Sequence, residues 1–113
     1  MASPITTHIL DTQAGRPAAG VPVKLFRKEQ GEWSSIAEGV TNDDGRITDW
    51  LEGQTRIAGT YRIWFDTDAY YAGKNERCFY PEVQIDFRIE HPDQHYHVPL
   101  LLAAHGFSTY RGS

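Results

Sequence analysis

The chain has 113 residues and a hydrophobic fraction of 40%, enough for one core but not two, so residues 1–113 are expected to form a single domain. The formal net charge is −4, and basic residues are interspersed with acidic ones, so no nucleic acid partner is expected. Cys78 is the sole cysteine, which excludes an intramolecular disulfide and any zinc motif built from paired cysteines.

Short runs of β-branched and aromatic residues, separated by Gly, Pro, Asn and Asp, predict about eight strands in an all-β sandwich or barrel. The first strand is predicted over Ile5 to Asp11. Because side chains alternate along a strand, His8 is expected on the face opposite to that of Ile9. The segment 12–20 contains two glycines and a proline, and it is predicted to be a connection outside the strand ladder.

The next two strands are predicted over Val21 to Glu29 and Trp33 to Val40. The short segment Gln30-Gly31-Glu32 between them is typical of a hairpin turn, so the two strands are expected to be antiparallel neighbours. A second turn is predicted at Thr41-Asn42-Asp43-Asp44-Gly45, whose residues tolerate positive φ or cap their own backbone. Arg46 follows this turn directly.

One helix is predicted in the middle of the chain, after two further strands. The strands are expected over Ile47 to Leu51 and Gly59 to Asp66. The helix is expected over Thr67 to Lys74, because Asp66 or Thr67 is suited to cap its start and Gly73 to end it.

The last three strands are predicted over Glu82 to Ile89, His95 to Ala103 and Phe107 to Arg111. The alternation within the second of these places His95 and His97 on the same face. The third is expected to pair back onto the second.

Nothing in the sequence indicates a membrane or a secretory signal. No stretch approaches the roughly 18 apolar residues of a spanning helix, and the N-terminus lacks the charged and apolar regions of a signal peptide. We therefore expect no membrane partner and a cytoplasmic protein, or a periplasmic one if a leader has been removed.

Three of the five histidines fall on predicted strands, namely His8, His95 and His97. Taken singly, each is more typical of an exposed or hydrogen-bonded surface residue than of a site. A zinc site made from His95 and His97 with His8 or His105 is an alternative, but carboxylate and thiolate companions at ligand spacing are missing.

Two arginines, Arg46 and Arg111, adjoin glycines at predicted strand ends. Side chains at the ends of different strands can meet at the same opening of a sandwich or barrel. A solvated arginine is the more common explanation of either one taken alone. Cys78 lies beside Phe79 and is more typical of packing than of an activated thiol. No G-x-S-x-G motif occurs, so a serine nucleophile is not indicated.

Three separated segments share the pattern of one family. They are Thr7-His8-Ile9-Leu10-Asp11-Thr12 with Gly15-Arg16-Pro17-Ala18, then Thr41-Asn42-Asp43-Asp44-Gly45-Arg46, and finally His95-Tyr96-His97-Val98-Pro99-Leu100-Leu101-Leu102 with the closing Tyr110-Arg111-Gly112-Ser113. Together they resemble the transthyretin-like 5-hydroxyisourate hydrolases over essentially the whole chain. The closing tetrapeptide is the most specific motif, because in this family it separates the hydrolases from the hormone-carrying transthyretins.

The resemblance implies an all-β, transthyretin-like sandwich of two four-stranded sheets with one short helix. It also implies a homotetramer, a dimer of dimers, with active sites in a channel between the dimers. It assigns three catalytic residues, His8, Arg46 and His97, and four residues that line the substrate pocket, Tyr110, Arg111, Gly112 and Ser113. His95 is not among them.

The implied function is hydrolysis of a small molecule, 5-hydroxyisourate, to 2-oxo-4-hydroxy-4-carboxy-5-ureidoimidazoline in urate degradation, with no metal or organic cofactor. Such a reaction needs a base of near-neutral pKa to activate water and a cation for the developing oxyanion. We expect His97, in a hydrogen-bonded network with His8, to deprotonate water while Arg46 stabilises the negative charge. Which histidine is the base stays open. The alternative is a non-catalytic small-molecule carrier of the transthyretin type, against which the closing tetrapeptide argues.

Overall fold

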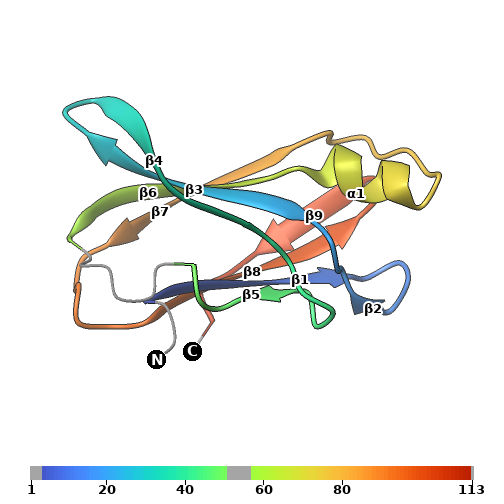
Figure 1. The fold of residues 1–113 in the computed structure, drawn as a ribbon, viewed down its shortest axis with the longest axis horizontal. Coiled ribbons are helices and arrows are strands. Elements are labelled where there is room, and N and C mark those ends of the chain that lie inside the picture. The colour runs from blue at the N-terminus through green and yellow to red at the C-terminus, as the bar shows by residue number, and fades with distance from the viewer. Residues whose placement is uncertain (1–3, 51–56, 113) are drawn as a thin grey trace.

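The computed structural model describes residues 4–50 and 57–112, in which two β-sheets lie face to face with a short helix at one end (Figure 1). The first sheet contains β1 (Ile5–Asp11), β2 (Arg16–Pro17), β5 (Arg46–Ile47), β8 (Tyr96–Ala103) and β9 (Gly106–Thr109). The second sheet contains β3 (Pro22–Glu29), β4 (Glu32–Val40), β6 (Gly59–Phe65) and β7 (Val83–Ile89). The helix, α1, spans Thr67–Gly73.

The order of strands places the first and the penultimate long strands of the chain side by side. The first sheet has the order β2-β1-β8-β9, and β1 runs parallel to β8. The two-residue strand β5 also pairs with β1. The second sheet has the order β4-β3-β6-β7 and is antiparallel throughout. The predicted pair of four-stranded sheets with one short helix is therefore confirmed, with β5 as an additional partner of β1.

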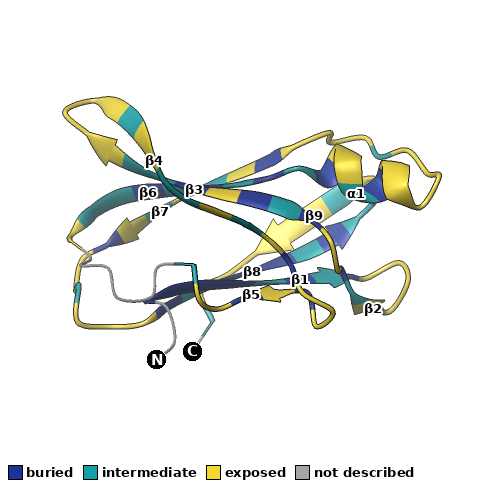
Figure 2. Cartoon of the chain, in the orientation of Figure 1, coloured by how far each residue is buried: buried dark blue, intermediate teal, exposed yellow. Residues whose placement is uncertain are grey.

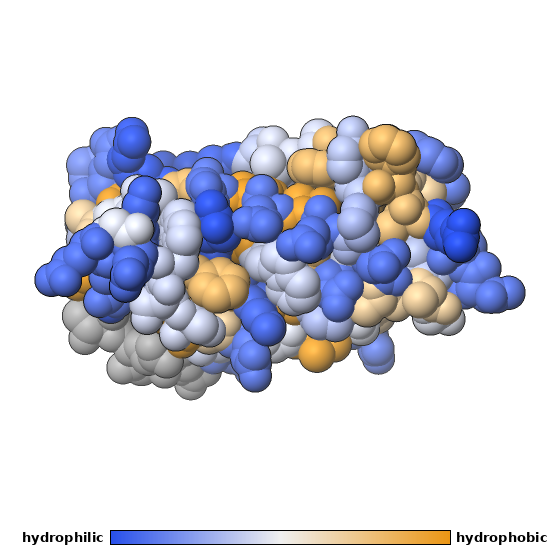
Figure 3. All heavy atoms as spheres, turned by 90° about the horizontal axis from the view of Figure 1, so that it is seen from above, coloured by the Kyte–Doolittle hydropathy of each residue, from blue (hydrophilic) through white to orange (hydrophobic). Residues whose placement is uncertain are grey.

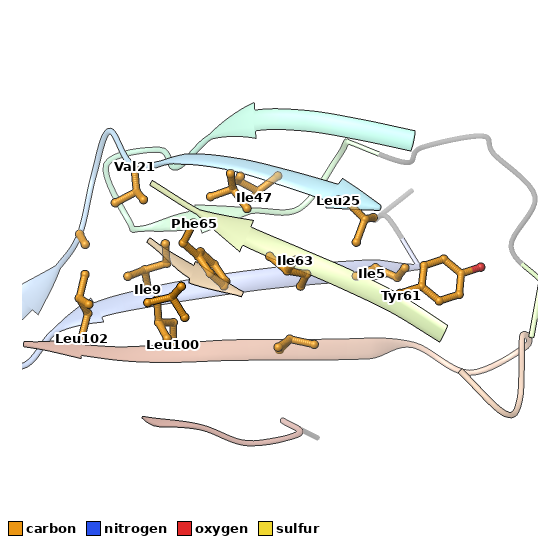
Figure 4. Close-up of a cluster of buried hydrophobic side chains, with 14 of the residues drawn as sticks. Ile5, Ile9, Val21, Leu25, Ile47, Tyr61, Ile63, Phe65, Leu100 and Leu102 are labelled. Carbon is orange, nitrogen blue, oxygen red and sulfur yellow. The ribbon is translucent and has the colours of Figure 1, made fainter. Parts of the chain in front are cut away.

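The core lies between the two sheets, where buried residues of β1, β3, β6, β7 and β8 gather (Figure 2). Ile5 and Ile9 of β1, Ile63 of β6 and Leu100 of β8 are fully buried there (Figure 4). Each such side chain contributes about 1.5–3 kcal/mol through removal of its apolar surface from water. His8 is only half-buried and points to the outer face, so its predicted orientation opposite to Ile9 is confirmed.

The outer face of the second sheet is mainly hydrophilic, with small hydrophobic patches between the polar residues (Figure 3). Long cationic side chains cover its tryptophans. The Arg62 guanidinium lies 4.1 Å from the ring centroid of Trp33, and the Lys24 ammonium lies 5.3 Å from that of Trp64. Such cation–π pairs keep the charged groups in water while they shield the rings.

The predicted helix is confirmed, and its cap explains its start. Asp66 accepts a hydrogen bond from the Ala69 amide at 3.0 Å, which satisfies one of the free N–H groups of the first turn. Beyond the helix, the Lys74 ammonium lies 2.8 Å from the fully buried Asp11 carboxylate, which also accepts from the Tyr70 hydroxyl at 2.6 Å. These bonds tie α1 to the end of β1. Within the described residues, no helix has the length and apolarity needed to cross a bilayer.

Two predicted segments differ from the structure. The connection predicted over 12–20 contains β2, because Gly15 at φ 71° closes a tight turn that folds Arg16 and Pro17 back onto β1. The strand predicted over Ile47 to Leu51 is β5, Arg46–Ile47, and Leu51 lies outside the described residues. The remaining predicted strand ends agree to within one or two residues.

Candidate active site

The two catalytic histidine candidates share the outer face of the first sheet. The parallel register of β1 and β8 sets Thr6 opposite His97 and His8 opposite Pro99. Opposed residues of neighbouring strands point to the same face of a sheet, so Thr6, His8 and His97 lie together on the side away from the core. Strand pairing thus gathers residues that lie about ninety positions apart in the chain.

Arg46 reaches this face through the turn that precedes it. The Asn42 side-chain oxygen accepts from the amides of Asp44 at 2.9 Å and Arg46 at 3.0 Å, which fixes the turn. Gly45 has φ 72°, and a Cβ at this position would lie 2.5 Å from the Ile9 carbonyl oxygen, so only glycine fits. The turn then delivers Arg46 directly opposite His8 in the β1–β5 pair.

The end of the described chain packs against His97. After β9, the Gly112 amide donates to the His97 carbonyl at 2.8 Å. A Cβ on Gly112 would lie 2.6 Å from Cδ2 of the His97 ring, so a side chain at this position would displace the imidazole. Gly112 therefore lies beside His97, whereas Ser113 lies outside the described residues.

Burial and a neighbouring cation lower the pKa values of both histidines. Burial first, and then the positive charge of Arg46, lower the pKa of His8 from its ordinary value of 6.5, against the opposing effect of Asp44. Burial, Arg46, His95 and His8 lower the pKa of His97, against hydrogen bonding with the backbone of Thr6. Both imidazoles are therefore mostly neutral at pH 7 and able to accept a proton.

Arg46 itself is exposed and forms no ion pair with a carboxylate among the described residues. Its guanidinium is therefore available to an anion or a developing oxyanion beside the two histidines. A neutral base next to a cation is the combination that activation of water and stabilisation of the resulting negative charge require.

Thr6 is a member of this face that the sequence reasoning did not single out. Its hydroxyl lies 2.8 Å from Nδ1 of His97 and 3.0 Å from Nε2 of His95. The available signal was the strand alternation, which already placed Thr6 on the same face as His8. What was missing was the register with β8. Among the described residues, no hydrogen bond joins His8 directly to His97, and the expected network between them stays a prediction.

Tyr110 and Arg111 line a hollow other than the face that carries His8, Arg46 and His97. Arg111 stacks on the Tyr96 ring at 4.2 Å and donates to the Gln94 side-chain oxygen at 3.2 Å. Both residues line an open cavity between β7 and β8, whose lining does not include His8, Arg46 or His97. The predicted role of Tyr110 and Arg111 in the substrate pocket stays a prediction.

The remaining candidate groups lie apart from this arrangement. His105 is exposed in the turn between β8 and β9, and Cys78 is partly buried in the segment between α1 and β7. Burial raises the pKa of the Cys78 thiol, which opposes thiolate formation. Among residues 4–50 and 57–112, no group of three or more His, Cys, Asp or Glu side chains could hold a metal ion, so the alternative zinc set is not formed there.

A protein-family model described as the HIUase/Transthyretin family matches residues 5–112. The chain belongs to this family. A family relative, the 5-hydroxyisourate hydrolase of Mus musculus, is 42% identical over 113 residues, which cover 98% of this chain and 96% of the relative. The resemblance inferred from the three sequence segments is thereby confirmed.

The solved structures that resemble this chain include a 5-hydroxyisourate hydrolase and a transthyretin. The 5-hydroxyisourate hydrolase of Klebsiella pneumoniae matches with a TM-score of 0.83 and 41% identity, covering 96% of this chain and 92% of that one. Sea bream transthyretin in complex with thyroxine matches with a TM-score of 0.90 and 35% identity, covering 96% of this chain and 94% of that one. Both have the same fold, so function must be argued from the side chains of the site.

Proposed function

We propose that this chain hydrolyses 5-hydroxyisourate, a step of urate degradation. The observation that carries the proposal is that His8, Arg46 and His97, from three separated segments, share one sheet face with both imidazoles held neutral beside a cation. Relatives named as 5-hydroxyisourate hydrolases, 41–42% identical over nearly the full length, support it.

In the proposed reaction, water attacks a carbonyl carbon of the cyclic amide. A neutral histidine removes a proton from the water as its oxygen bonds to the carbon, and Arg46 stabilises the oxyanion that forms on the carbonyl oxygen. The C–N bond then breaks, and the leaving nitrogen takes up the proton that the histidine carried. The ring opens to 2-oxo-4-hydroxy-4-carboxy-5-ureidoimidazoline, and the protein returns to its starting state.

We assign His97 as the base and His8 as its neighbour that binds or orients the substrate. Nδ1 of His97 is engaged by Thr6, which leaves Nε2 as the ring nitrogen without a partner among the described residues. Arg46 is the one cation that lowers the pKa of His8, and Asp44 raises that pKa, whereas Arg46, His95 and His8 all lower the pKa of His97. Gly112 and the predicted pocket residues Tyr110, Arg111 and Ser113 would bound the substrate.

The experiment is to generate 5-hydroxyisourate in situ from urate with urate oxidase and to follow the decay of its absorbance. Addition of the purified chain is expected to accelerate the decay in proportion to its concentration. A decay rate that does not depend on the chain contradicts the proposed function.

A carrier function is the second candidate, because the transthyretin structure with thyroxine matches this fold with a TM-score of 0.90. A carrier would bind a small aromatic ligand without turning it over. Saturable binding of such a ligand together with an unchanged decay of 5-hydroxyisourate would favour the carrier over the enzyme.

We also propose that four chains assemble as a dimer of dimers that encloses the histidine face. His8 and His97 are half-buried and Arg46 is exposed on the outer side of a sheet, where a partner chain would exclude water from them. Sedimentation equilibrium is expected to give a mass near four times the 12.8 kDa of one chain. A stable, fully active monomer contradicts this assembly.

Replacement of Gly112 by alanine is expected to lower kcat/KM by about 10²-fold, the cost of a misplacement of a catalytic group by roughly 1 Å. The new Cβ would lie 2.6 Å from Cδ2 of His97 and would push the ring away from Thr6. Gly106→Ala is the matched control, because a Cβ there meets nothing within 4 Å. Equal kcat/KM values for G112A and G106A would show that the contact with Gly112 does not position His97.

A further inference from the structure

Thr6 is the only hydroxyl that contacts two imidazoles in the described part of the chain. Its Oγ1 lies 2.8 Å from Nδ1 of His97 and 3.0 Å from Nε2 of His95. The two rings lie 6.4 Å apart, at 28° to each other, so the hydroxyl lies between nearly parallel neighbours. Thr6 is only 3% exposed, so water does not compete freely for these two bonds.

The single hydrogen of this hydroxyl restricts the protonation of both rings. A threonine hydroxyl donates one hydrogen bond and can accept others. If Thr6 donates to His95, it accepts from an Nδ1–H of His97, and Nε2 of neutral His97 carries a lone pair. If Thr6 donates to His97 instead, the proton of neutral His97 lies on Nε2, and this nitrogen cannot act as a base.

The surroundings of His97 favour the first arrangement. The side chains that act on its charge are His8 from β1, Arg46 from β5 and His95 from the residue just before β8, and all three oppose additional positive charge. A positive environment favours an exposed lone pair over an exposed N–H group on the free nitrogen. Thr6 engages Nδ1 of the ring, so among the described residues Nε2 is the nitrogen left for a reactant.

We propose that Thr6 is a positioning residue that accepts a hydrogen bond from Nδ1 of His97 and donates one to Nε2 of His95, so that His97 presents an unprotonated Nε2 to water. His95 thereby acts as the fixed acceptor that orients the Thr6 hydroxyl. The functional part of this inference rests on the proposed hydrolysis, whereas the tautomer is a property of the protein alone.

The first test is the tautomer of His97 in the wild-type protein, measured by two-bond ¹H–¹⁵N correlation NMR on ¹⁵N-labelled protein above the pKa of His97. The expected result is a protonated Nδ1 and a bare Nε2. A protonated Nε2 on neutral His97 would overturn the proposal whether or not the protein hydrolyses 5-hydroxyisourate.

The second test is a set of three variants. Thr6→Val removes the hydroxyl at nearly constant shape, and Thr6→Ser retains it. Thr7→Val is the matched control. Thr7 is the next residue of β1, but its side chain lies on the core side, where its hydroxyl donates to the Val98 carbonyl at 2.6 Å.

We expect T6V to lower kcat by about 10-fold or more, the usual loss when the partner of a functional histidine is removed, with little change in KM because Thr6 is buried. In T6V the NMR spectrum is expected to show a mixture of His97 tautomers, whereas T6S restores both kcat and the single tautomer. T7V is expected to retain both. Wild-type kcat in T6V, or a folded T6S as impaired as T6V, would overturn the positioning role. An inactive wild-type protein would instead refute the hydrolase proposal and leave the tautomer result standing.

Discussion

Replacement of His97 by alanine is expected to reduce kcat for 5-hydroxyisourate by about 10²-fold or more, the usual contribution of a general base. The reason is that Thr6 holds Nδ1 of the His97 imidazole, which leaves Nε2 without a partner among the described residues. Without this group, water must be deprotonated by a weaker base. The measurement is the initial rate of decay of 5-hydroxyisourate at saturating substrate and at fixed pH.

The same assignment fixes the direction of the pH dependence. Because the pKa of His97 lies below its ordinary 6.5, the base is already neutral at pH 7, and kcat/KM is expected to stay high until the pH falls below that lowered value. The acid limb should be absent from H97A. His105→Ala is the control, because His105 is an exposed imidazole in the β8–β9 turn. An H97A protein with wild-type kcat and an unchanged acid limb would assign the base elsewhere.

Replacement of Arg46 by alanine is expected to lower kcat by about 10²–10³-fold, the cost of losing one group that stabilises an oxyanion. A second effect distinguishes Arg46 from a residue that only binds substrate. Its charge lowers the pKa values of both His8 and His97, so its removal should raise them and move the acid limb of kcat/KM to higher pH.

Two comparisons test this role of Arg46. Arg46→Lys retains the charge but loses the planar donor pair, so it should restore the position of the acid limb more fully than it restores kcat. Arg77→Ala removes an exposed arginine from the segment before β7 and should change neither quantity. If R46A and R77A give the same kcat and the same pH profile, Arg46 is not the oxyanion group.

Much of the fold could be predicted because its strands alternate clearly. The alternation in Ile5 to Asp11 predicted both the strand and the outward orientation of His8. The connection over 12–20 was predicted from its glycines and proline, but these residues do not reveal that Arg16 and Pro17 pair back onto β1. Such a short pair depends on the turn at Gly15 and on the neighbouring strand, which local composition does not report.

The residues proposed as catalytic came from a family resemblance, and their meeting on one face depends on a strand order that periodicity does not give. Alternation indicates which face a side chain occupies, but it does not tell which strands are neighbours or in what register they pair. The contact of Thr6 with His97 depends on both, across 91 positions of sequence. The orientation of Arg111 toward Tyr96 likewise follows from the path of the chain after β9.

The parallel pairing of β1 with β8 also constrains how the protein is made. During translation β1 is made early, but its partner β8 starts at Tyr96 and is synthesised only after β2 to β7. Until then one edge of β1 has no native neighbour, a state in which nascent chains are prone to aggregate. Contacts between such distant segments also slow folding. The proposed hydrolytic activity should therefore appear late in biosynthesis, once β8 has paired with β1.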